Sequence, residues 1–89
     1  MPHPRFSSEE VVRRGEAIYA RDLQARLEPD HHGEIVVIDI ESGDHWLGPD
    51  EAVALRAARA GRPNAALYVM RVGFPTAVRI GARSVRAAR

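Results

Sequence analysis

The sequence predicts a single α+β domain, in which two helices pack on a four-stranded antiparallel sheet in the chain order α-β-β-α-β-β. Three observations predict this fold. Residues 34–40 form one strongly apolar run, and residues 65–72 form the only other run apolar enough to lie beside it. Each run follows a segment with helical signals, and each is followed by a turn and a short returning strand. Burial of the two apolar runs at the centre gives the sheet order 2-1-3-4.

The length and composition set the boundaries of this domain. The 89 residues suffice for one core, which we expect over residues 6–83, between a flexible lead at 1–5 and a basic flexible tail at 84–89. The chain has no cysteine, so neither a disulfide framework nor a thiolate metal site is expected. No apolar run approaches the roughly 18 residues that span a bilayer. Without a secretory signal, the expected location is the cytoplasm, with no membrane partner.

The first helix has a well-defined start. Ser7 as N-cap and Glu10 three residues later form a capping box, and Phe6 can pack on Val11 as a hydrophobic staple. Apolar residues then recur with helical spacing to about Leu27.

Two further residues of this region constrain the helix. Gly15 costs about 1 kcal/mol relative to alanine in mid-helix. Its presence predicts a close approach, which favours packing on the sheet over packing on a second copy of the helix. Pro29 disfavours helical structure at the residue before it, so the helix is expected to end after about Leu27, with residues 28–33 as the terminating segment.

The first strand, residues 34–40, is apolar on both faces. Alternation places Val36 and Ile38 on one face and Ile35 and Val37 on the other. We expect the helices to cover one face of this strand. We expect the other face to be covered by something that the monomer does not supply. The strand returns through a two-residue loop, Ser42-Gly43, into the second strand at residues 45–48.

The second half repeats the helix-hairpin arrangement. A helix starts at residues 48–51, with Pro49 at its first position, and stops at Gly61. The third strand covers residues 65–72, and after a turn the fourth returns at residues 77–80 as an open edge.

The charges are unevenly distributed along the chain. All thirteen basic residues are arginine; residues 1–51 hold five of them and all twelve acids, a balance of −7. Residues 52–89 hold eight arginines and no acid, a balance of +8. If the two halves occupy different surfaces, this segregation favours head-to-tail association or an acidic partner for the basic face.

Few residues have the character of a catalytic or metal site. His31 and His32, with Asp30 and His45, lack the spacings of known metal sites, so solvated loop histidines are expected, with no metal and no cofactor. Asp39, on a half-buried strand face, needs a partner, and Arg71 on the third strand is the natural candidate for a structural ion pair.

One basic strand face is a candidate interaction surface. It combines arginines with aromatic residues: Arg71, Arg79, Arg83, Tyr68 and Phe74. Nucleic-acid readers use this combination for phosphate contact and base stacking. No helix-turn-helix, zinc-finger or RNA-recognition signature accompanies it, so binding of a protein partner or of a second copy is favoured.

Several segments resemble a group of small uncharacterised bacterial proteins with the pattern Gly-x-(apolar)4-Asp, Gly-Asp-Tyr, a helix, then Tyr-x-x-Arg-Ile-Gly. The matching segments here are residues 15–19, 33–39, 43–44, 48–50, 63–65, Tyr68 and residues 71–73. The sequence has His45-Trp46 where the group has an aromatic residue after Gly-Asp. The group looks like products of small accessory operons, and this resemblance implies an antitoxin-like or adaptor role without a mechanism.

The sequence therefore predicts a non-catalytic protein-interaction module, acting as a homo-oligomer or as a small antitoxin-like or regulatory partner. The first alternative is a nucleic-acid-binding protein that uses the arginine-rich second half. The second is a small metal-dependent hydrolase that uses Asp39, Asp44 and the histidines.

Overall fold

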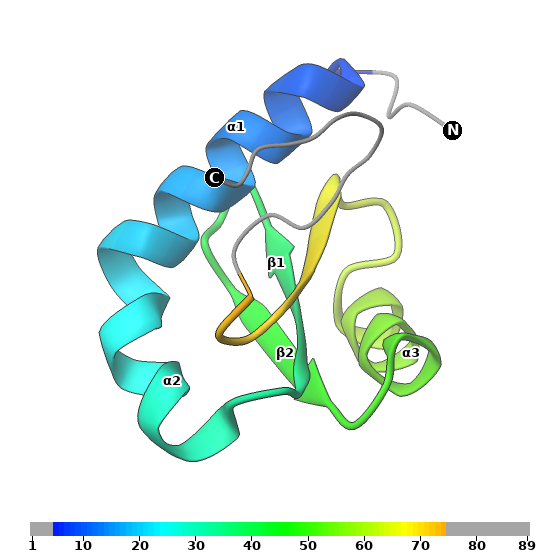
Figure 1. Cartoon of the computed structure of the whole chain (residues 1–89). Coiled ribbons are helices and arrows are strands. Elements are labelled where there is room, and N and C mark those ends of the chain that lie inside the picture. The colour runs from blue at the N-terminus through cyan, green and yellow to red at the C-terminus, as the bar shows by residue number, and fades with distance from the viewer. Residues whose placement is uncertain (1–4, 75–89) are drawn as a thin grey trace.

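The computed structural model describes residues 5–74, which form an α+β domain with a three-stranded antiparallel sheet (Figure 1). The elements in chain order are α1 (Ser8–Ile18), η1 (Tyr19–Leu23), α2 (Gln24–His31), β1 (Ile35–Asp39), β2 (His45–Gly48), α3 (Glu51–Gly61) and β3 (Leu67–Arg71). The strand order is β2-β1-β3, which confirms the predicted order for these three strands. The predicted fourth strand, at residues 77–80, lies outside the described residues.

The helices cover both faces of the sheet. In Figure 1, the long helical segment α1-η1-α2 lies on one side of the strands and α3 lies on the other. Val36 and Ile38 belong to the core under the long segment, whereas Ile35 and Val37 pack with Ala54 and other residues beneath α3. The expectation that one face of β1 would need cover from outside the monomer is therefore wrong. The alanines of α3 allow the helix to lie close to the strand.

The start of α1 follows its prediction in the Ser7 cap, whereas the Glu10 carboxylate pairs with Arg14 and not with the Ser7 N–H. The Ser7 hydroxyl accepts a hydrogen bond from the Glu10 N–H at 3.1 Å, and both Phe6 and Val11 pack against the core. The carboxylate of Glu10 binds Arg14 one turn further on, at 2.8 Å. The Ser7 cap and the packing of Phe6 and Val11 on the core together fix where the chain enters the helix.

The end of the long helical segment differs from the prediction. The chain widens into the π-helical turn η1 and then continues as α2 through Pro29 to His31. Contacts on both sides of the proline explain this, because Leu27 is buried in the core and the His31 carbonyl accepts a hydrogen bond from Glu34. These tertiary contacts outweigh the local preference of the residue before proline.

Tyr19 in η1 links the long helix to the far end of β3. Its hydroxyl donates to the Glu28 carboxylate at 2.9 Å and accepts from the Gly73 N–H at 3.3 Å. Burial, followed by the interaction with Glu28, raises the pKa of the Tyr19 phenol above its ordinary value of 10.0.

This raised pKa predicts a loss of stability in alkali. The folded state holds the phenolic proton more tightly than the unfolded state, so the free energy of unfolding falls as the pH rises above about 10. A Tyr19→Phe variant is expected to be less stable at pH 7, because the Glu28 and Gly73 contacts are lost, but to show a shallower alkaline decline. Urea unfolding between pH 8 and about 11 measures both slopes. Parallel slopes would contradict the role given to Tyr19.

The hairpin between β1 and β2 is longer than predicted. The Asp39 and Asp44 main chains still pair at 2.8 Å, so the chain reverses over residues 40–43 instead of Ser42 and Gly43 alone. Gly43 does take the expected positive φ, 85°. Ile40 stays in the core with Val36 and Ile38, and its N–H donates to the Ala66 carbonyl at 3.2 Å.

The remaining differences concern the start of α3. Asp50 caps the helix, and its carboxylate accepts from the Val53 N–H at 3.0 Å. Pro49 therefore precedes the cap and does not occupy the first helical position. Among residues 5–74, no helix has the length and apolar character needed to cross a membrane.

Candidate functional site

Of the described residues of the predicted basic strand face, Arg71 and Phe74 lie together at a turn, where the Phe74 N–H donates to the Arg71 carbonyl at 3.0 Å, whereas Tyr68 points the other way. Tyr68 is 8% exposed and faces the long helical segment, where its ring lies against Gly15. Arg71 is exposed on the opposite side of β3 and donates to the Gly33 carbonyl at 2.9 Å. Arg79 and Arg83 lie outside the described residues. Tyr68 is therefore a core residue and is not presented for base stacking.

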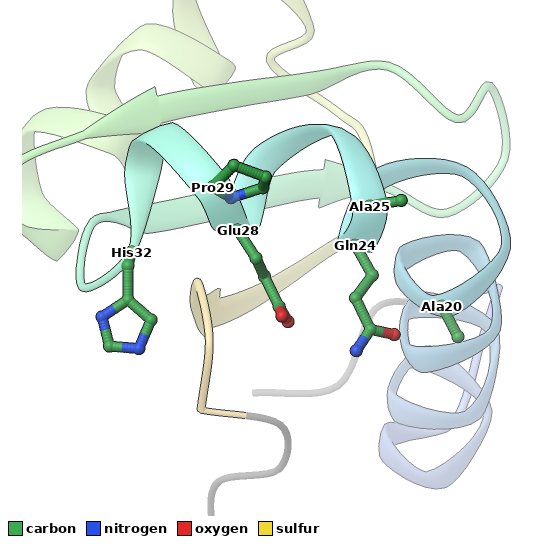
Figure 2. A pocket seen from close by; sticks show the side chains of 6 residues that line it. All are labelled: Ala20, Gln24, Ala25, Glu28, Pro29 and His32. Carbon is green, nitrogen blue, oxygen red and sulfur yellow. The ribbon is translucent and has the colours of Figure 1, made fainter.

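Phe74 is the one aromatic member that the structure places at the surface, with 49% of its area exposed. Its ring packs against the His32 ring, with the centroids 5.0 Å apart. His32 in turn stands at one end of an open groove of about 570 Å³ on the outer side of η1 and α2 (Figure 2). The lining residues are Ala20, Gln24, Ala25, Glu28, Pro29 and His32. This groove offers contact area but no cluster of reactive groups.

The predicted ion pair between Asp39 and Arg71 is wrong. The antiparallel register places Arg71 opposite Ile35 and places Asp39 opposite Leu67. The two positions are four residue steps apart along β3, which is about 13 Å along the sheet. The distance follows from the strand pairing, because β3 runs antiparallel to β1 and its last residue meets the first residue of β1.

Asp39 instead organises the hairpin and holds the end of α3. The residue is 2% exposed, and its carboxylate accepts from the Glu41 N–H at 2.9 Å and from the Ser42 N–H at 3.4 Å. Arg62, directly after α3, lies 3.7 Å from the same carboxylate and also binds Asp44. Sequence reasoning identified the need for a partner but missed Arg62, which is distant in sequence and becomes visible only when α3 is placed over β2.

The histidines are spread over separate places. His31 lies 3.2 Å from the Glu34 carboxylate, His32 packs on Phe74, and His45 lies on β2. Within residues 5–74, no three histidine, aspartate or glutamate side chains converge as a metal site would require. Asp44 is held by Arg62. The arrangement therefore gives the metal-dependent hydrolase hypothesis no geometric support.

A polar cleft of about 710 Å³ separates the long helical segment from the first hairpin. It is lined by Arg21, Asp22, Leu23, Arg26, Gly43, Asp44, His45 and Trp46. Burial, and next the positive charge of Arg26, lower the pKa of His45 below its ordinary value of 6.5, against the opposing effect of Asp44. Sequence reasoning did not connect Arg26 with His45. Strand alternation, which turns His45 and Leu47 to the same side, was the only available signal.

Within residues 5–74, the helical layers on the two sides of the sheet carry opposite net charge. Residues 8–31, on one side of the sheet, carry six acids and four arginines, a balance of −2. Residues 51–62, on the other side, carry one acid and three arginines, a balance of +2. The outer layers of this single domain therefore have opposite net charge (Figure 1).

Each of these layers also exposes a valine between charges. On α1, Val12 is 42% exposed, and Glu9 and Glu16 occupy the same helical face. Arg13 projects beside them, so this α1 stripe, defined as residues 9, 12, 13 and 16, retains a net negative charge.

The corresponding surface on α3 is basic. Val53 is 39% exposed and shares the outer face with three other exposed residues. This α3 stripe consists of Val53, Arg56, Ala57 and Ala60, and Arg59 lies at its margin. Both stripes lie on regular helices, which hold their side chains in fixed positions.

The comparisons with known proteins add no family to this description. No protein-family model matches the chain, and neither a curated protein nor a solved structure matches it significantly. The functional argument therefore depends on the residues themselves, and it has two starting points: the complementary helical stripes and the polar cleft.

Proposed function

We propose that this protein is a non-catalytic interaction module that associates with further copies of itself, with the α3 stripe of one copy on the α1 stripe of the next. The observation that carries the proposal is the opposite charge of the two outer layers, each with an exposed valine at its centre. Arginines at 56 and 59 can approach glutamates at 9 and 16 while Val53 meets Val12. Such pairing supplies specificity and faster association, and the apolar contact supplies affinity.

The proposed contact is heterologous, because it joins two different surfaces. Each copy keeps one free stripe of each kind after the first contact, so assembly continues until a ring closes or a filament forms. A regulatory or antitoxin-like role uses the same α3 stripe on an acidic surface of another protein. Self-association is favoured here because the chain itself carries the complementary stripe.

The first expected result is association that depends on salt. At about 50 mM salt, light scattering should show species heavier than the monomer, and at about 500 mM, where charges are screened within a few ångströms, the mean mass should fall. A monomer at both salt concentrations would overturn the proposal. A salt-resistant dimer would also count against it, because an apolar interface would then replace the charged one.

Charge-reversal variants distinguish a specific contact between the two stripes from a general effect of net charge. We expect Arg56→Glu with Arg59→Glu, and separately Glu9→Arg with Glu16→Arg, to be monomeric at low salt. An equimolar mixture of the two variants should associate again, because each restores the partner that the other has lost. Arg21→Glu with Arg26→Glu, which makes the same net-charge change outside both stripes, is the matched control and should still associate. Failure of the mixture to associate would show that the stripes do not meet.

A further inference from the structure

The polar cleft between the long helical segment and the hairpin has its carboxylates already engaged. Asp22 forms two hydrogen bonds with Arg21, at 2.9 and 2.7 Å, and Asp44 binds Arg62. Within residues 5–74, no carboxylate lies within ion-pair distance of Arg26. Of the cleft's charged groups, Arg26 therefore has the greatest capacity to bind an added ligand.

His45 is positioned on the opposite wall. It pairs with Ile38 on β1, and because Ile38 faces the long helical segment, His45 faces the same way. His45 and Arg26 thus approach the cleft from the sheet and from α2. Each wall is held by the fold, since Leu23 anchors the helix in the core and Leu47 anchors the strand.

We propose that this cleft binds a phosphate group, held by the guanidinium of Arg26 and the protonated imidazole of His45. A guanidinium presents several N–H donors in the geometry that phosphate oxygens accept, and imidazolium adds a further charged donor. An anion is the ligand class that suits Arg26 facing an imidazole that can take up a proton, where the neighbouring acids are already paired. The proposal does not depend on self-association, because the cleft lies outside both stripes.

The electrostatics of His45 agree with this site. The groups that act on it are Arg26 and His31, which lower its pKa, and Asp44, which raises it; burial is the largest cause and also lowers it. Phosphate between Arg26 and His45 would offset the repulsion and would favour the charged imidazole. Binding should therefore be accompanied by uptake of a proton by His45 from solvent, and it should weaken as the pH rises from the His45 pKa of the free protein to the higher pKa of the complex.

The test is a histidine NMR titration of the full chain between pH 5 and about 8, with and without inorganic phosphate at constant ionic strength. Phosphate is expected to raise the pKa of His45, and the ring signals of the other histidines should not respond to phosphate. In Arg26→Gln, the His45 pKa should already be higher without phosphate, because the repulsion is gone, and phosphate should bind about tenfold more weakly or worse. Arg14→Gln removes the same charge from α1, outside the cleft and outside both stripes, and should bind phosphate as the wild type does.

Three results would overturn the proposal. Phosphate could leave the His45 pKa unchanged, it could move the ring signals of every histidine equally, or Arg14→Gln could weaken binding as much as Arg26→Gln does. Thermal unfolding of each variant establishes that the fold is intact. A second titration, with adenosine monophosphate, identifies the source of the phosphate. If adenosine monophosphate binds more tightly than inorganic phosphate, the site is assigned to a nucleotide. If the two bind equally well, the site is assigned to free phosphate.

Discussion

A Gly15→Leu variant is expected to lose about 3 kcal/mol of its free energy of unfolding, the upper end of the usual cost of overpacking a core. A Cβ atom at this position would already overlap the ring of Tyr68. The ring has little room to move, because Tyr68 lies in the core with Ile18 and Met70. The rest of the leucine side chain would force α1 away from the sheet.

Urea unfolding measures this loss, and two comparisons identify its cause. Leucine has a far better helix propensity than glycine, so the local effect of the substitution is stabilising and opposes the expected result. Ala17→Leu places the same side chain at an exposed position of α1 and should change stability by less than about 0.5 kcal/mol. Adding Tyr68→Ala to Gly15→Leu should cost less than the two single changes combined, since the smaller residue removes the overlap. Additive costs would show that Gly15 is needed for another reason.

An Asp39→Ala variant is expected to be the next most damaging, at about 2–4 kcal/mol. The substitution removes the acceptor of the Glu41 and Ser42 N–H groups and leaves the guanidinium of Arg62 with Asp44 alone. The hairpin loop and the end of α3 would then lose a shared attachment. The affected N–H groups are part-buried, so water can replace the lost contacts only incompletely.

Two further variants divide this effect into its parts. Asp39→Asn keeps an oxygen acceptor for the loop but removes the charge opposite Arg62, so we expect a loss of about 1 kcal/mol. Arg62→Gln should also lower the free energy of unfolding by only about 1 kcal/mol. The Arg62 side chain is 46% exposed, and exposed ion pairs contribute little to stability. The measurement is urea unfolding at pH 7. If Arg62→Gln were as damaging as Asp39→Ala, the ion pair and not the turn would be the main role of Asp39.

The predicted and observed sites differ because they depend on different information. The need of Asp39 for a partner follows from an acid among apolar strand residues, but the choice of Arg62 over Arg71 depends on strand register and on the position of α3. Likewise, Tyr68 and Arg71 are three residues apart, and strand alternation places them on opposite faces. Strand alternation alone therefore indicates, without a structure, that Tyr68 and Arg71 do not share a face.

Local signals in the sequence determined the elements whose causes are themselves local. The Ser7 cap, the positive φ of Gly43 and the apolar runs of β1 and β3 all follow from side-chain chemistry over a few neighbouring residues. The close approach at Gly15 could also be anticipated, because a glycine in mid-helix is unfavourable unless a neighbour requires the space.

Tertiary structure alone decided how these elements combine. It placed α3 on the face of β1 opposite the long helical segment, and it carried that segment through Pro29 to His31. It also brought Arg26 to the same cleft as His45. Burial of apolar area is non-directional, so the sequence indicates which residues must be covered but not which element covers them. That choice depends on packing and register over the whole domain.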